Sequence, residues 1–196
     1  MDGIIPLYKE RGMTSFACVS RLRQILKTKK IGHSGTLDPG VAGVLPICVG
    51  NATKVVDYLM QSGKQYQGEL LIGFATTTQD LDGDKIEEKV VADEIPTSEI
   101  LAAMNSLTGT IIQIPPMYSA VKVNGKKLYE YARAGETVER PKRQVTISKF
   151  ELLSSKYDEK NKQQRIRFNV ECSKGTYIRT LVVDLARKLG YPGVMS

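Results

Sequence analysis

The order in which strand-type and helix-type patterns follow one another constrains this fold most. Residues 165–173 alternate between apolar and polar side chains, which is typical of a strand with one buried face. Other strand patterns lie at residues 64–72, 85–91, 110–114 and 145–152, and amphipathic helix patterns at 14–27, 97–107 and 179–189. Strands and helices do not alternate regularly, as they would around a parallel sheet. The order therefore predicts an α+β fold with a mixed, mainly antiparallel sheet flanked by helices.

The composition is that of a folded domain. The chain has 196 residues, of which 41% are hydrophobic and 25% are charged, so we expect one domain, or one domain with a small insertion. It has no secretory signal pattern and no apolar run of the ~20 residues that cross a bilayer. Three scattered cysteines and one histidine provide no zinc set. We expect a cytoplasmic protein without a metal or a membrane partner.

The charge balance favours a polyanionic partner. Twenty-eight lysines and arginines against 21 acidic residues give a net charge of +7. Such an excess favours nucleic acid, because bound phosphates release their counterions. Many basic proteins bind no nucleic acid, so charge alone does not decide the function.

Residues 32–40 concentrate unusual side chains in one short segment. They include His33, the single histidine of the chain, and Asp38, which precedes Pro39. A proline disfavours helical geometry in the residue before it, and the glycines of the segment favour turns. We expect a loop that presents Asp38. Taken alone, His33 fits a hydrogen-bonded structural residue and Asp38 a turn former.

Two further polar segments have simple interpretations. Residues 80–84 (Asp-Leu-Asp-Gly-Asp) fail as a calcium loop, because Lys89 falls where a bidentate glutamate is required. We interpret them as a turn, with the alternative that one aspartate hydrogen-bonds across an active-site cleft. Residues 156–164 are charged and polar, which predicts a solvated hairpin loop between two strands.

Three separated segments together resemble the TruB family of pseudouridine synthases. They are residues 32–39 (Gly-His-Ser-Gly-Thr-Leu-Asp-Pro), 113–122 (Gln-Ile-Pro-Pro-Met-Tyr-Ser-Ala-Val-Lys) and 174–181 (Lys-Gly-Thr-Tyr-Ile-Arg-Thr-Leu). Their order and spacing are similar to those of the bacterial tRNA enzymes that modify uridine 55 of the T-loop. The resemblance implies a pseudouridine synthase catalytic domain over residues 1–196, with a central RNA-binding cleft. It also implies the tRNA T stem-loop as partner, a monomer, and no cofactor.

The resemblance also implies a role for particular residues. Asp38 corresponds to the nucleophile, Arg179 to its cationic partner, and Tyr66 to a tyrosine that stacks on uracil and assists loss of the C5 proton. His33 would hold the opened RNA and Tyr177 would line the base pocket. Candidate phosphate contacts are Lys30, Lys64, Lys126 and Lys174. Without the resemblance, Arg179 fits a surface cation and Tyr66 a core aromatic residue.

The resemblance leaves two alternatives to the tRNA enzyme. Family members normally continue with another core segment and a PUA-type RNA-binding domain, so we expect both to be absent from this chain, which ends at Ser196. One alternative is a dyskerin-like subunit guided by a small RNA. The other is a non-catalytic tRNA-binding or folding module, against which Asp38, Tyr66 and Arg179 argue.

Overall fold

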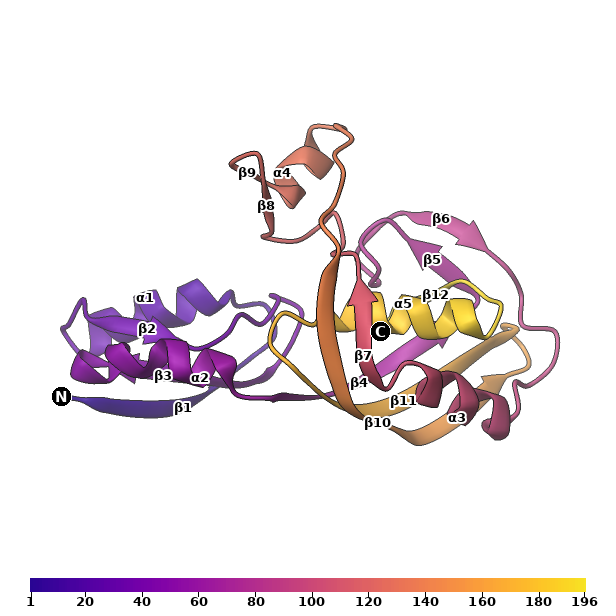
Figure 1. Ribbon diagram of the computed structural model, residues 1–196, viewed down its shortest axis with the longest axis horizontal. Coiled ribbons are helices and arrows are strands. Elements are labelled where there is room, and N and C mark those ends of the chain that lie inside the picture. The colour runs from indigo at the N-terminus through magenta and orange to yellow at the C-terminus, as the bar shows by residue number, and fades with distance from the viewer. The chain divides into compact units, whose positions relative to one another are not determined.

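The computed structural model describes residues 1–196 and contains two compact units, Met1–Ser62 and Gly63–Ser196. Both are built from antiparallel sheets and helices (Figure 1), which confirms the predicted α+β class. The single catalytic domain over residues 1–196 stays a prediction. None of the helices combines the length and the apolar character needed to cross a membrane.

The first unit is a three-stranded antiparallel sheet in the order β1-β3-β2 with a helix packed on it. Buried side chains of α1, such as Val19, share a core with Leu45 and Ile47 of the sheet. Two short helices, η1 and α2, follow the last strand. The elements are β1 (Gly3–Lys9), α1 (Ser15–Ile25), β2 (Ile31–His33), β3 (Gly43–Val49), η1 (Gly50–Val55) and α2 (Val56–Gln61).

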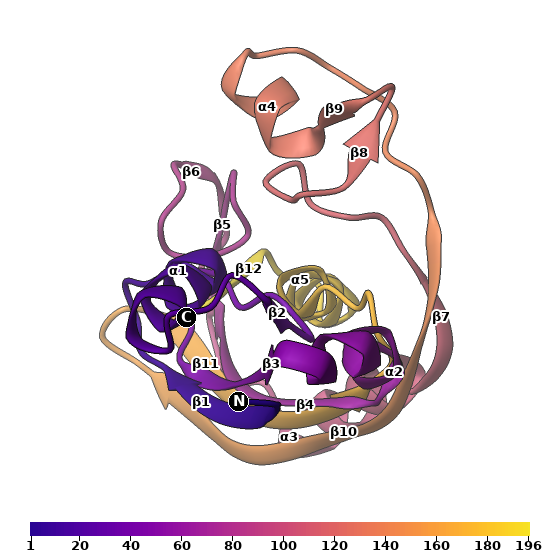
Figure 2. The same ribbon diagram turned by 90° about the vertical axis from the view of Figure 1, so that its left-hand side faces the viewer.

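The second unit is a five-stranded antiparallel sheet in the order β12-β4-β11-β10-β7. Helices α3 and α5 bury their apolar faces in one core with this sheet, and Figure 2 shows α5 on the concave side of the curved strand β10. These elements are β4 (Lys64–Ile72), α3 (Thr97–Ser106), β7 (Gly109–Gln113), β10 (Arg143–Asp158), β11 (Gln163–Cys172), α5 (Ile178–Lys188) and β12 (Gly193–Met195).

Two small hairpins extend from this sheet. The first hairpin is formed by β5 and β6. The second is formed by β8 and β9, is followed by α4, and lies away from the sheet in both views (Figure 1, Figure 2). Their elements are β5 (Phe74–Thr76), β6 (Lys85–Glu88), β8 (Lys122–Val123), β9 (Lys126–Lys127) and α4 (Leu128–Arg133). The predicted strand at 85–91 therefore ends three residues early.

The hairpin predicted at residues 156–164 is present, but the predicted extent of its loop is wrong. Strand β10 continues to Asp158 and β11 begins at Gln163, so the turn between them covers only residues 159–162. The Asn161 N–H donates to the Asp158 carboxylate at 3.0 Å, and Lys162 adopts a left-handed φ of 50°. Strand pairing satisfies the backbone while most of the polar side chains stay at least partly exposed, so their polarity does not indicate a loop.

Candidate functional site

The Asp38 segment joins two strands of the first unit. Gly32 and His33 lie in β2 and pair with Cys48 and Ile47 of β3, so the loop predicted over residues 32–40 begins only at Ser34. A Cβ added to Gly32 would lie 3.4 Å from a methyl group of Val56, so this strand packs closely against that residue. Asp38 itself is exposed to solvent. The sheet therefore presents the carboxylate on a loop close to the end of β2.

Both neighbours of Asp38 are anchored to the first unit. Ser15 is only 3% exposed, and its hydroxyl accepts the Leu37 N–H at 3.0 Å and donates to the Leu37 carbonyl at 3.2 Å. On the other side, the Pro39 carbonyl accepts the Gly12 N–H at 2.8 Å. These bonds tie the loop to the residues at and just before the start of α1.

A buried lysine supports the same region. Lys9 is 1% exposed, and its ammonium group donates to the carbonyl oxygens of Met13 at 2.8 Å and Glu10 at 3.1 Å. A longer contact of 3.5 Å reaches the Pro39 carbonyl. Because a buried cation must be well solvated by polar groups, these carbonyl oxygens take the place of water. The sequence provided no signal for this role.

His33 and Lys30 belong to the same unit as Asp38. The His33 Nδ1–H donates to the carbonyl oxygen of Gly35. The half-buried ring is thus oriented by the loop that follows it. Lys30 is exposed, and its ammonium group donates to the Asn51 side chain at 2.9 Å.

Arg179 is the centre of a polar cluster in the second unit. Its Nη1 donates to the Thr78 carbonyl at 2.9 Å and to the Asp80 carboxylate at 3.1 Å, and its Nη2 donates to the Tyr118 carbonyl at 3.0 Å. The side chains of Arg179 and Asp80 are 15% and 26% exposed. A guanidinium held from several sides in a partly desolvated setting is fixed in orientation as well as charge.

Asp80 is a polar residue that the sequence indicated only as an alternative. Its carboxylate accepts hydrogen bonds from the Thr78 hydroxyl and, at 3.1 Å, from the Asp82 N–H, in addition to Arg179. The predicted turn at residues 80–84 is present. Its first aspartate also forms the ion pair with an arginine 99 residues away in the chain. The acidic turn was the available signal, but nothing in it distinguished Asp80 from Asp82 or Asp84.

The two tyrosines also belong to the second unit. Tyr66 lies in β4 opposite Val170 of β11 and packs, half-buried, against the core of this unit. Tyr177 is the residue immediately before α5, and its backbone is bound by the side chain of Gln113. The structure thus places both tyrosines in the unit that holds Arg179. The pairing of Asp38 with Arg179 stays a prediction.

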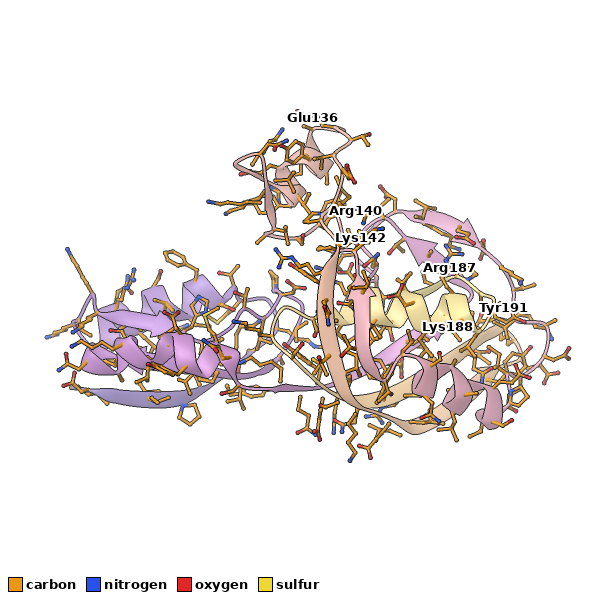
Figure 3. All side chains as sticks on the ribbon, in the orientation of Figure 1. Glu136, Arg140, Lys142, Arg187, Lys188 and Tyr191 are labelled. Atoms are coloured by element: carbon orange, nitrogen blue, oxygen red, sulfur yellow. The ribbon has the colours of Figure 1, made fainter.

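The remaining predicted lysines of this unit differ in their surroundings. Lys64 begins β4 and is half-buried, whereas Lys174 is exposed in the turn before α5. Lys126 forms an ion pair with Glu136 at 2.8 Å and lies 4.5 Å from the centre of the Tyr131 ring. Figure 3 labels Glu136, with Arg140 and Lys142 further along the same segment toward β10.

Comparison with known families bears on this arrangement. The model of the TruB family pseudouridylate synthase N-terminal domain matches residues 23–178 of the chain. The chain belongs to the TruB family. The match includes Asp38 and its loop, Tyr66, and the turn that carries Asp80.

Relatives of the TruB family with curated names are similar over all of this chain. It is 99% identical to the tRNA pseudouridine synthase B of Limosilactobacillus reuteri, 62% to that of Levilactobacillus brevis and 56% to that of Halalkalibacterium halodurans. All of this chain is covered in each comparison. The chain spans only 65%, 65% and 64% of the length of these relatives.

Solved structures with a similar fold include chains of larger complexes. One chain of the "Crystal Structure of a Cbf5-Nop10-Gar1 Complex" superposes with a TM-score of 0.70 at 31% identity, over 99% of this chain and 46% of that one. A chain of the "Structure of H/ACA RNP bound to a substrate RNA containing 2'-deoxyuridine" gives 0.68 at 27% identity, over 99% and 45%. These matches agree with the mixed α+β architecture predicted for a TruB-family chain.

Proposed function

We propose that this protein converts uridine 55 in the T-loop of tRNA to pseudouridine. The observation that carries the proposal is the similarity, over the whole chain, to proteins named tRNA pseudouridine synthase B, at identities of 56–99%. The 31% identity to a chain of the Cbf5 complex is much lower, which favours the tRNA enzyme over a subunit guided by a small RNA.

The reaction rearranges one nucleoside without an external reagent. The N1–C1′ bond breaks, the uracil turns, and C5 joins C1′; C5 loses its proton, and N1 gains one. Asp38 is the proposed nucleophile, attacking either C1′ of the ribose or C6 of the base, so that a difficult exchange is divided into easier steps. Its anchored neighbours, Leu37 and Pro39, support this role because they restrict where the carboxylate can point.

Arg179 is the proposed cationic partner of the Asp38 carboxylate. A positive charge beside a carboxylate in a site that excludes water favours its ionised form. The five N–H donors of a guanidinium allow it to bind two carboxylates, so the ion pair with Asp80 is compatible with this role. In this proposal Asp80 and the Thr78 and Tyr118 carbonyl oxygens orient the guanidinium.

The base must leave the RNA stack before it can react. Flipping a base costs roughly a few kcal/mol, which stacking on an aromatic ring can offset in part. Tyr66 is the proposed stacking partner and assists removal of the C5 proton; Tyr177 lines the pocket. His33, with its ring oriented by Gly35, is proposed to stack in the opened RNA loop.

In this proposal, basic side chains bind the RNA backbone. Phosphate contacts set the register of an RNA without reading its sequence. Of the proposed contacts, Lys30 and Lys174 are exposed, while Lys64 and Lys126 are half-buried. The side chains of the Lys126–Glu136 ion pair are 36% and 52% exposed, so exchanging the carboxylate for a phosphate costs little.

The test compares two aspartates of the first unit in a protein extended to the length of its relatives. Asp38→Asn should abolish tritium release from a T stem-loop RNA labelled at uracil C5 and leave RNA binding within about threefold, because the amide keeps the shape but loses the nucleophile. Asp57→Asn, at an exposed position in α2, is the matched control and should react like the unaltered protein.

Three outcomes separate the alternatives. Pseudouridine formation by Asp38→Asn at the unaltered rate would exclude Asp38 as nucleophile. Activity that appears only after a guide RNA and partner proteins are added would favour the dyskerin-like subunit. Tight binding of the RNA without any pseudouridine would favour a non-catalytic tRNA-binding module.

A further inference from the structure

A buried glutamine holds the backbone at the start of α5. Gln113 is the last residue of β7 and is 1% exposed. Its Oε1 accepts the Tyr177 N–H at 3.0 Å, and its Nε2 donates to the Tyr177 carbonyl at 3.2 Å. One side chain therefore satisfies both polar backbone groups of a residue 64 positions away, as a neighbouring strand would do.

The position of Tyr177 decides where α5 begins. Its carbonyl accepts the Leu181 N–H at 3.0 Å, which is the first hydrogen bond of the helix, and its own side chain provides no cap. Gln113 thus fixes the backbone of the residue that immediately precedes the helix. Because the peptide before a helix sets the direction of the first turn, this contact bears on Ile178 and Arg179 directly.

The rest of α5 is held by other contacts. Leu181 and Leu185 are completely buried in the core of the second unit, and the Thr180 hydroxyl donates to the Gln79 side chain at 3.1 Å. At the far end, Lys89 donates to the Gly190 carbonyl at 2.7 Å. Loss of the Gln113 contact should therefore loosen residues 177–179 and leave the body of the helix in place.

We propose that Gln113 is a positioning residue for the reaction, acting through the Tyr177 backbone on the Arg179 guanidinium and the Tyr177 ring. This inference rests on the proposed function, in which Arg179 is the partner of the nucleophile. The guanidinium and the ring both extend from the turn that Gln113 holds. A shift of this turn moves both relative to the substrate while the fold persists.

The same unit contains a matched control. Gln164 is completely buried, and it binds Ile95 in the same way: the Ile95 N–H donates to its Oε1 at 2.7 Å and its Nε2 donates to the Ile95 carbonyl at 3.0 Å. It also donates to the Ser155 hydroxyl at 2.8 Å. Ile95 lies just before α3 and none of these contacts involves a proposed site residue. A purely structural effect should be the same or larger at Gln164.

The experiment replaces each glutamine by methionine, which has a similar length and no hydrogen-bonding amide. In the protein of full family length, both variants should melt at lower temperature. Well below those temperatures, Gln113→Met should lower kcat on the T stem-loop RNA about tenfold or more with KM within about twofold, since a misplacement of ~1 Å can cost ~100-fold. Gln164→Met should leave kcat within about twofold.

A glutamate at either position provides a second readout that does not depend on the methionine variants. Protonated glutamate can donate to one backbone carbonyl and accept from the N–H, whereas the carboxylate cannot donate. The kcat of Gln113→Glu, divided by that of the unaltered protein, should therefore rise as pH falls, and the same ratio for Gln164→Glu should stay flat.

The outcomes distinguish this inference from the function on which it rests. If the unaltered protein is active and the two methionine variants have equal kcat, the positioning role of Gln113 is excluded and the proposed function stands. If the unaltered protein makes no pseudouridine, the proposed function and this role fail together.

Discussion

Replacing Ser15 by alanine tests whether the anchored loop matters for activity. Ser15 is 3% exposed and its hydroxyl bridges the N–H and the carbonyl of Leu37, next to Asp38. Alanine removes both hydrogen bonds and leaves the methylene in place. The loop then keeps its connection through Pro39 but loses the one through Leu37.

The expected size of the effect follows from these two bonds. Each contributes about 0.5–1.5 kcal/mol net, so we expect Ser15→Ala to lower the free energy of unfolding by about 2 kcal/mol. A domain with a stability of about 5–15 kcal/mol stays folded at 25 °C after this loss. The released carboxylate should instead lower kcat for pseudouridine formation about tenfold or more, since orientation dominates such steps.

Thr14 provides the control because it is the adjacent hydroxyl residue. Its side chain accepts the Ala17 N–H at 3.0 Å and caps α1. Thr14→Ala should cost about 1 kcal/mol of stability, as other lost caps do, and leave kcat within about twofold. Thermal unfolding and tritium release from the labelled RNA measure the two effects. Equal kcat values for the two variants, both folded, would refute the reasoning.

Two further predictions concern stability. In α5, burial raises the pKa of Asp184 from 3.8 to about 6, although the charge of Lys188 acts in the opposite direction. The contribution of this group to the free energy of unfolding is therefore fully present below pH 4 and is lost as the pH rises through 6. Asp184→Asn should therefore raise the free energy of unfolding at pH 8 by on the order of 1 kcal/mol at this partly exposed position, and not at pH 4. Thermal unfolding at the two pH values measures this, and an equal gain at both would contradict the prediction. A Cβ on Gly193 would lie 2.6 Å from the Ala186 Cβ, so Gly193→Ala should cost about 1–3 kcal/mol in urea unfolding. A Cβ on Gly3 would meet no atom within 4 Å, so Gly3→Ala should leave the free energy of unfolding unchanged. An equal loss of stability in Gly3→Ala and Gly193→Ala would exclude the steric cause.

The strands that could be predicted share a regular local pattern. Residues 64–72 and 165–173 alternate with period two, and the structure places β4 and β11 there as antiparallel neighbours. The short strands β2 and β12 have three residues each, too few for such a pattern. The polar side chains of residues 156–164 led to a loop predicted too long, because paired strands satisfy their backbone hydrogen bonds whatever their side chains are.

The candidate site likewise contains residues that the sequence indicated and contacts that it did not. The resemblance to the TruB family singled out Asp38, Tyr66 and Arg179, whereas without it Arg179 fits a surface cation and Tyr66 a core aromatic residue. Nothing in the spacing indicated that Asp80 pairs with an arginine 99 positions away.

By itself, the sequence determined the fold class, the family resemblance and the residues proposed for the chemistry. The fold class follows from local periodicity, and the family resemblance, which supplies the residues proposed for the chemistry, follows from three separated motifs. Only the tertiary structure decided what holds those residues: Ser15 on Leu37 and Gln113 on Tyr177. The physical reason is that such bonds end on backbone N–H and carbonyl groups, which nearly every residue carries, so no sequence pattern can mark the partner.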